Sequence, residues 1–317
     1  MDEWTPEALN AQFAIPGHIM FRAGSGGLVR AEIANAAATA QIALQGAQVL
    51  TFQPQRSAPV LFLSPHARYA PGKAIRGGIP ICWPWFGPHP TDPTKPQHGF
   101  VRTLPWTVRG TGELDTGTTE LRLGLDDTPA TRALWPHPFA LTLTVQVGRA
   151  LRVVLATHNP GDQPLPLTEA LHSYFYIGSL AGLIVEGLEG TTYSDKVAGG
   201  QRQVQAGPVT IRDETDRVYL HTTHACHVED PALQRRIQIA KEGSQSTVIW
   251  NPGRAKAAQL ADLGADTYTQ MICVEVGNAL DDAVSVAPGA THEVAMMIGI
   301  TPLGGETPAT GAGPDPA

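Results

Sequence analysis

Three segments of the chain gather residue types that suit proton transfer and anion binding. The first, from Arg76 to Trp106, contains two arginines, two histidines, three of the chain's six tryptophans and seven prolines. The second carries His172, and the third carries Glu275. Imidazole and carboxylate groups can exchange protons near neutral pH when the protein shifts their pKa values, and guanidinium groups bind phosphate.

The first segment has the composition of a binding loop. Proline-rich loops are rigid, and binding groups are often placed on rigid loops of a β scaffold. Arg76 and Arg102, together with nearby glycine amides, would suit a phosphate, and tryptophan rings commonly stack on sugars. The aromatic residues Trp83, Trp85 and Phe86, taken alone, favour the core, because large rings are usually buried for packing. The whole set favours a site.

His172 lies in the second segment, Leu167–Gly178. If this segment is one strand, His172 shares a face with Tyr174 and Tyr176. A single histidine among aromatic residues is more often structural than catalytic, although its titration near neutral pH also suits proton transfer.

Glu275 lies in the third segment, Met271–Ala279, which is otherwise apolar. We expect it on the same face of a strand as Met271 and Cys273. A carboxylate in such surroundings must be paired, solvated in a cleft or raised in pKa. Glu275 is therefore a stronger functional candidate than a surface acid, although a buried salt bridge would also explain it.

A histidine cluster suggests a metal site only weakly. His221, His224 and His227 lie beside Cys226, but the flanking sequence indicates strand and loop, so a spacing of three does not bring them to one face. We expect a solvated loop here. A metal-dependent lyase or isomerase that uses this cluster is the alternative.

The elements around these segments are predicted to be short strands. The clearest hairpin joins 141–147 to 151–157 through a three-residue link that contains glycine. Further strands are expected at 120–125, 217–221, 235–240, 247–250, 271–276 and 294–298. Short helices are expected at 129–134 and from Asn251 to a stop at Gly264, while 31–44 fits either a helix or an opening hairpin.

This pattern predicts an all-β, antiparallel fold. We expect one domain over residues 1–302, followed by a disordered Gly/Pro-rich tail at 303–317.

Composition excludes several classes of protein. Charged residues make up only 16% of the chain, the net charge is −7 and no basic run is present, which argues against nucleic-acid and anionic-membrane partners. The three cysteines are far apart, which is typical of free thiols in a reducing compartment. Because no signal peptide or membrane-spanning stretch is apparent, we expect a cytoplasmic protein.

Six pieces of the sequence, in this order, resemble the hexose-6-phosphate mutarotases, also called glucose-6-phosphate 1-epimerases, of the galactose-mutarotase-like superfamily. The pieces are RGGIPICWPWFGPHP, QHGFVR, TEALHSYF, TDRVY, WNPGRAKAAQLAD and ICVEVGNA. They fall within a stretch from about Phe13 to Ile300. The resemblance implies a large antiparallel β supersandwich with a sugar on its concave face.

The resemblance also implies which residues act. His172 corresponds to the general acid and Glu275 to the general base. The implied substrate-binding residues are Arg76, Gln97, His98, Arg102 and Asp216. Of these, the arginines would face phosphate, His98 would contact the reacting end of the sugar, and Asp216 would hold sugar hydroxyls.

The implied reaction interconverts the α and β anomers of a hexose 6-phosphate by opening and closing the ring. The acid and the base would stand on opposite sides of the hemiacetal, and neither a cofactor nor a metal is needed. We expect a monomer. The alternatives are an aldose 1-epimerase for free hexoses and a carbohydrate-binding protein that has kept the fold without catalysis.

Overall fold

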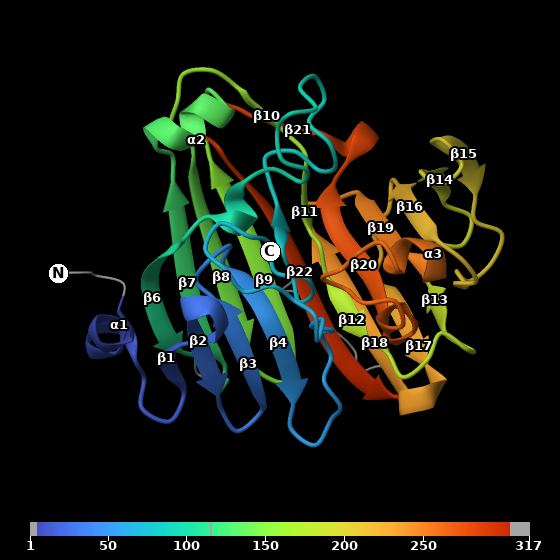
Figure 1. Cartoon of the computed structure of the whole chain (residues 1–317), viewed down its shortest axis with the longest axis horizontal. Helices are drawn as coiled ribbons and strands as arrows, with labels where there is room; N and C mark the ends of the chain where they lie inside the picture. Colours follow the sequence, from blue (N-terminus) through green and yellow to red (C-terminus); the bar gives the residue numbers. More distant parts are fainter. Residues whose placement is uncertain (1–4, 115, 305–317) are drawn as a thin grey trace, which may run out of the picture.

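The computed structural model describes residues 5–114 and 116–304, and the described strands form four sheets of eight, eight, four and two strands (Figure 1). Neighbouring strands pair antiparallel throughout. The predicted all-β, antiparallel class is therefore confirmed.

One eight-stranded sheet, called here the site sheet, carries Glu275 and Asp216, and His172 lies between two of its strands. Its order is β15–β14–β16–β19–β20–β11–β5, and β12 also pairs with β20. The bounds are β5 Ile81–Cys82, β11 Glu169–Leu171, β12 Tyr174–Tyr176, β14 Thr192–Asp195, β15 Gln201–Val204, β16 Thr215–Leu220, β19 Ser246–Asn251 and β20 Met271–Asn278.

The other eight-stranded sheet, called here the long sheet, has the order β13–β17–β18–β22–β9–β8–β7–β6. Its strands are β6 Thr107–Glu113, β7 Thr119–Asp126, β8 Ala140–Val147, β9 Leu151–His158, β13 Ile184–Glu186, β17 Cys226–Asp230, β18 Arg235–Glu242 and β22 Thr291–Pro302.

Two smaller sheets and short helices complete the described fold. The four-stranded sheet contains β1 Ile19–Ala23, β2 Val29–Ala34, β3 Ala38–Ala43 and β4 Gln48–Pro54, and β10 Leu165–Leu167 pairs with β21 Val284–Val286. The α-helices are α1 Pro6–Phe13, α2 Pro129–Leu134 and α3 Gly253–Ala257. Single 3₁₀ turns lie at Ser25–Gly27, Val101–Thr103, Pro231–Leu233, Thr267–Gln270 and Leu280–Asp282. In Figure 1, β1–β4 overlie the long sheet at the left, and β16, β19 and β20 stand at the right.

The strands form where the sequence alternates between apolar and polar residues. In β8, Leu141, Leu143, Val145 and Val147 are buried at every second position, which turns one face of the strand to the core. One continuous hydrophobic cluster includes buried side chains of the four-stranded, long and site sheets. The predicted hairpin is confirmed, with β8 and β9 in register from Ala140↔His158 to Val147↔Leu151.

The other predicted strands are also present, and 31–44 falls in β2 and β3, as the hairpin alternative expected. Helix α2 coincides with the prediction. The helix predicted to stop at Gly264 is wrong in length, because α3 ends at Ala257. Tertiary contacts outweigh the helical preference of the remaining alanines: Ser64 Oγ donates to the main-chain oxygen of Asp262, and Leu263 is buried.

Strand β20 has buried residues at every position, so both of its faces are covered. Ile272, Val274 and Val276 pack in the main hydrophobic cluster, while Met271 and Cys273 belong to a second, smaller cluster that includes Tyr174. Because side chains alternate along a strand, Glu275 points to the same side as Met271 and Cys273, as predicted.

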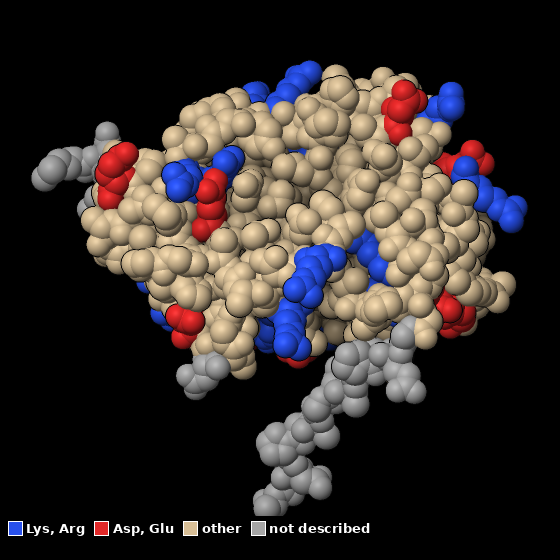
Figure 2. Space-filling view, turned by 90° about the horizontal axis from the view of Figure 1, so that it is seen from below, with Lys and Arg blue, Asp and Glu red and all other residues tan. Residues whose placement is uncertain are grey.

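Charged side chains are sparse on the face of the molecule seen from below (Figure 2). In the view from below, uncharged residues dominate, a group of basic side chains lies near the middle of the face, and acidic ones lie mostly towards its edges (Figure 2). No helix in residues 5–114 and 116–304 is long and apolar enough to cross a membrane. The shared hydrophobic cluster supports our proposal that residues 1–302 form one domain. All but two residues of the predicted disordered tail, 303–317, lie outside the described residues.

Candidate active site

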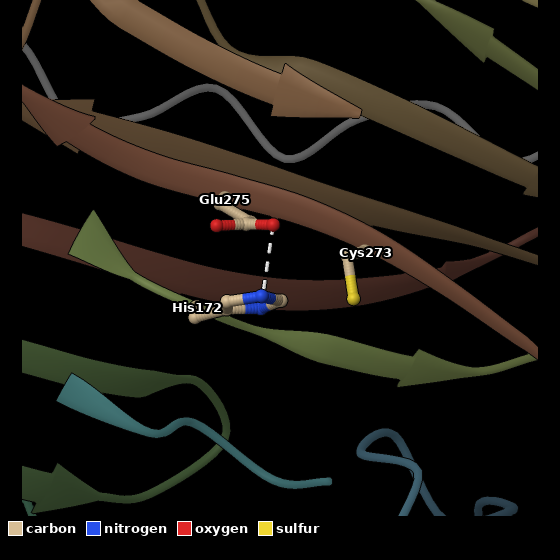
Figure 3. A group of neighbouring side chains, drawn as sticks. All are labelled: His172, Cys273 and Glu275. Carbon is tan, nitrogen blue, oxygen red and sulfur yellow. Dashed lines mark ion pairs between the residues drawn. The ribbon is translucent and has the colours of Figure 1, made fainter. Parts of the chain in front are cut away.

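His172 and Glu275 meet on the site sheet (Figure 3). Glu275 lies on β20, and His172 directly follows β11, whose residue Leu171 pairs with Val276. His172 Nδ1 and Glu275 Oε1 are 3.3 Å apart. The expected placement on opposite sides of a hemiacetal therefore does not describe this structure, because the two groups touch and a sugar cannot lie between them.

A break in the backbone sets the position of His172. Residues 167–178 do not form one continuous strand, because β11 ends at Leu171 and β12 begins at Tyr174. At the break, the His172 N–H donates to the oxygen of Pro80 (3.0 Å), and Ser173 Oγ donates to the oxygen of Val274 (2.7 Å). The imidazole stacks on the Tyr174 ring, with centroids 4.8 Å apart and planes 8° apart, so the predicted shared side of His172 and Tyr174 is confirmed.

Burial shifts both members of the pair towards their neutral forms. Glu275 is 1% exposed, and its burial raises the pKa of the carboxyl well above the ordinary value of 4.5. His172 is 8% exposed, and burial, together with the nearby charges of Arg102 and Arg76, lowers the pKa of its imidazole well below 6.5. Burial therefore favours a protonated carboxyl beside a neutral imidazole, and because the two groups touch, their titrations are coupled.

His98 lies beside His172 as a neutral hydrogen-bond donor. The ring centroids are 5.6 Å apart, and His98 Nδ1 accepts a hydrogen bond from the Gly87 N–H at 3.2 Å. Because Nδ1 accepts, the ring proton of neutral His98 resides on Nε2. Burial and the charge of Arg102 lower the pKa of His98 to about 3, so the ring stays neutral near pH 7. Its backbone is left-handed (φ 62°), as is that of Gly99 (φ 70°), where a Cβ would lie 1.7 Å from the Trp83 oxygen.

Arg76 is already engaged by protein groups. Its Nε and Nη2 donate to the two carboxylate oxygens of Asp262, each at 3.3 Å, and Nη1 donates to the Tyr174 hydroxyl at 3.0 Å. The Tyr174 hydroxyl and the Asp262 carboxylate raise the pKa of Arg76, which keeps the guanidinium charged. Since Tyr174 stacks on His172, Arg76 is linked to the pair through this tyrosine.

Arg102 has more free donors than Arg76. Its Nη2 donates to the main-chain oxygen of Gln97 at 2.7 Å, and no carboxylate pairs with it among the described residues. Gln97 is exposed and Arg102 half-buried. The positive charge of Arg102 lowers the pKa of both His98 and His172, which places this cation close to the pair.

Asp216 lies near the same site together with Lys196, which the sequence did not reveal as a candidate. Asp216 is on β16, and Lys196 directly follows β14. The main-chain N–H of Lys196 donates to the Asp216 oxygen at 2.8 Å, and its Nζ lies 3.6 Å from Asp216 Oδ1. Burial raises the pKa of Asp216, and Lys196 opposes that shift. The charge of Lys196 also lowers the pKa of Glu275.

Aromatic rings border the pair. Trp250, on β19, contacts the His172 ring edge-on with centroids 6.1 Å apart, and Phe86 contacts His98 at 5.1 Å. Phe86 also lies under the Lys196 ammonium, 4.6 Å from the ring centroid. Trp83 and Trp85 are buried in the main cluster, so the core interpretation is confirmed for them. It is wrong for Phe86, which is only half-buried.

Neither Lys196 nor Trp250 could be identified from its neighbours in sequence. Lys196 follows an ordinary strand, and Trp250 ends an apolar run of a kind that usually belongs to a core. Both join the site only because β14, β16, β19 and β20 lie in one sheet. The histidine cluster is a different case: His221 and His224 are exposed, as expected for a solvated loop, and His227 is half-buried on β17.

Three side chains of the site have the donor types of a metal centre. His172, Cys273 and Glu275 each offer one ligand atom, and these atoms all lie within 4.8 Å of one another. A separate cavity of about 550 Å³ adjoins the site. It shares Phe86 and Lys196 with the site but is lined mainly by apolar residues, which include Trp85, Leu167 and Val284. Neither His172 nor Glu275 lines this cavity.

Comparison with known proteins identifies the family of this chain. The family model described as aldose 1-epimerase matches residues 30–299. A relative from Salmonella typhimurium, provisionally named glucose-6-phosphate 1-epimerase, is 39% identical over 237 residues, which cover 74% of this chain and 78% of the relative. A relative from Escherichia coli K12 with the same provisional name is 38% identical, over 76% of this chain and 80% of its own length.

A solved structure supports the same identification. The crystal structure of a protein from Salmonella typhimurium, provisionally called a mutarotase, superimposes with a TM-score of 0.86 and 33% identity. The match covers 92% of this chain and 96% of the other. The chain belongs to the aldose 1-epimerase family.

Proposed function

We propose that this protein interconverts the α and β anomers of a hexose 6-phosphate, with glucose 6-phosphate as the substrate. The observation that carries the proposal is the buried pair His172–Glu275, 3.3 Å apart, with three cations nearby, Arg76, Arg102 and Lys196. The names of the Salmonella and Escherichia coli relatives point to the same substrate.

In the proposed mechanism the pair acts as one proton carrier. One member takes the proton from O1 of the sugar while the other gives its proton to the ring oxygen O5. The C1–O5 bond breaks, C1=O1 forms, and rotation about C1–C2 exposes the other face of the aldehyde. O5 then attacks C1, its proton returns to the pair, and O1 is reprotonated, so the pair ends as it began.

Contact between the two residues is compatible with this scheme. O1 and O5 are both bonded to C1, so two groups 3.3 Å apart can reach them from the same side of the sugar. We keep His172 as the acid and Glu275 as the base for opening, with the reverse roles for closure, which requires the proton of the pair to lie on the imidazole when the ring opens. A proton can pass between two groups that are 3.3 Å apart. The neutral His98, with a proton on Nε2, would donate a hydrogen bond to the oxygen that gains charge.

The remaining roles follow the charges. Arg102, with Gln97 beside it, would bind the phosphate dianion with free N–H groups, and Asp216 would accept hydrogen bonds from sugar hydroxyls. Arg76 would support the phosphate while it holds Tyr174 under the imidazole. The mechanism requires neither a cofactor nor a metal, and we propose that the protein is a cytoplasmic monomer.

The test is exchange NMR on the anomeric protons of glucose 6-phosphate, with glucose as a parallel sample. Dilute buffer is needed because phosphate and imidazole catalyse the background reaction. We expect exchange cross-peaks that grow with enzyme for the phosphosugar. Exchange of glucose alone would instead identify a free-aldose epimerase, for which the engagement of Arg76 by Asp262 is the favouring observation. Binding of either sugar without exchange would identify a binding protein.

A further inference from the structure

The catalytic pair has a third neighbour that the proposed reaction does not use. Cys273 lies two residues before Glu275 on β20, and its sulfur points to the same side as the carboxylate (Figure 3). The ligand atoms of His172, Cys273 and Glu275 all lie within 4.8 Å of one another. Nitrogen, sulfur and oxygen donors in one small volume are a set that Zn²⁺ accepts.

The spacing of these donors is close to that of a zinc centre. Tetrahedral angles with Zn–N of about 2.0–2.1 Å and Zn–O of about 2.0–2.2 Å place nitrogen and oxygen ligands roughly 3.4 Å apart. The corresponding distance between His172 Nδ1 and Glu275 Oε1 is 3.3 Å. The longer Zn–S bond, about 2.3 Å, requires the Cys273 sulfur to approach both ligands by up to roughly 1 Å, which a change in its side-chain torsion can supply.

The donor atoms are also poorly satisfied by the protein itself. His172 Nδ1 and Glu275 Oε2 have no hydrogen-bond partner among the described residues, although both atoms are buried. Cys273 is fully buried, and Glu275 is 1% exposed. Buried polar atoms of native proteins are nearly always paired. Two unpaired polar atoms on side chains that also lie next to a thiol therefore indicate a place where a ligand can bind.

We propose that His172, Cys273 and Glu275 bind a thiophilic divalent cation, with Zn²⁺ as the prototype, and that the bound ion blocks anomerisation. Binding forms a Zn–S bond as the Cys273 thiol releases its proton to solvent, and the pair releases the proton that it shares. The imidazole lone pair and the carboxylate oxygen then coordinate the metal, so neither can exchange protons with O1 or O5 of the sugar. The inhibitory part of this inference rests on the proposed function, whereas the metal site itself does not.

The experiment uses the full chain freed of metal with a chelator, the variant Cys273→Ala and the matched control Cys226→Ala. Cys226 is also a free, buried thiol, but it lies on β17 of the long sheet. Co²⁺ replaces Zn²⁺ as a spectroscopic probe, because a thiolate ligand gives it a near-ultraviolet charge-transfer band. Zn²⁺ inhibition of glucose 6-phosphate exchange is measured on the same samples, and chelator is then added to test reversal.

We expect one equivalent of Co²⁺ to give the charge-transfer band in wild type and Cys226→Ala but not in Cys273→Ala. Zn²⁺ should inhibit the first two proteins reversibly, and its inhibition constant should rise at least tenfold in Cys273→Ala, whose metal-free exchange stays near wild type. Cys273→Ser serves in the same way if the alanine variant does not fold.

Two results would overturn the inference. The site is excluded if no thiolate band appears in wild type, or if Cys273→Ala keeps both the band and the inhibition. Inhibition is excluded if the band appears while exchange continues at its metal-free rate. A thiolate band in a wild-type protein that shows no exchange even without metal would support the site and contradict the proposed function, so the two failures are distinguishable.

Discussion

Neutral replacements of His172 and Glu275 should show that the two side chains work as one unit. His172→Asn and Glu275→Gln each remove a proton-transfer group and keep a polar side chain of similar shape. A general acid or base typically contributes about 10²–10⁴-fold to the rate. We therefore expect kcat/KM for glucose 6-phosphate to fall by about 10²–10⁴-fold in each single variant, with the fold intact.

The double variant distinguishes a unit from two independent residues. If the residues were independent, their effects would multiply to a loss of about 10⁴–10⁸-fold. The structure predicts otherwise, because Nδ1 and Oε1 are 3.3 Å apart, so the protonation of one group depends on that of the other. Losing either residue leaves the other without its partner. The kcat/KM of the double variant should therefore fall by about as much as that of the more damaged single variant. This corresponds to a coupling free energy of about 3 kcal/mol or more.

The assay is exchange NMR at enzyme concentrations high enough to raise the slow variants above the uncatalysed background. Glu169→Gln is a matched control, because Glu169 is another fully buried carboxylate in contact with a histidine, His292, at 3.1 Å. That pair joins the site sheet to β22 and is absent from the proposed mechanism, so this variant should keep near-wild-type exchange. Circular dichroism confirms that each variant is folded.

Two results would refute this reasoning. Near-wild-type exchange by either single variant would show that the residue is not part of the proton relay. A double variant that falls by the product of the single losses, below the detection limit that each single variant clears, would show that His172 and Glu275 act independently despite their contact.

Four further predictions follow from the charges of the site. Burial lowers the pKa of His172 and raises that of Glu275, so we expect neither group to titrate near pH 6.5 and kcat/KM to be flat in a profile from about pH 5.5 to 8. A change in kcat/KM centred near pH 6.5, as an unperturbed imidazole would give, would contradict this. Because the pKa of Glu275 is raised in the folded protein, its carboxyl stabilises the fold below pH 4.5, its ordinary pKa, and this stabilisation is lost as pH rises through the folded-state pKa. The melting temperature of Glu275→Gln in thermal unfolding should therefore rise relative to that of wild type as pH increases. Arg102→Ala should raise KM for glucose 6-phosphate by about 10–100-fold and change that for glucose little, as steady-state kinetics on both sugars can measure, and equal effects would make the arginine structural. Lys196→Met removes the charge that lowers the pKa of Glu275, so the alkaline limb of its pH profile should move upward, and an unmoved limb would contradict this coupling.

Much of the fold could be predicted from short-range sequence pattern. The hairpin of β8 and β9 and helix α2 follow from alternation, turn residues and local capping, which depend on neighbouring residues only. The helix expected to reach Gly264 failed because the contact that decides its end, Ser64 with Asp262, joins residues far apart in the chain. Helix propensity depends on the local sequence and therefore cannot predict a contact between residues so far apart.

For the site, the sequence by itself determined the residue types: an imidazole, a carboxylate in an apolar strand, and arginines in a proline-rich loop. It also predicted the side of β20 on which Glu275 lies, because side chains alternate along a strand. Only the tertiary structure brought His172 into contact with Glu275, paired Arg76 with Asp262 and placed Lys196 beside Asp216. These contacts depend on how strands distant in the sequence pair within one sheet and on how deeply each group is buried. Burial also sets the direction of each pKa shift, so the protonation states that the chemistry requires are decided by the folded structure.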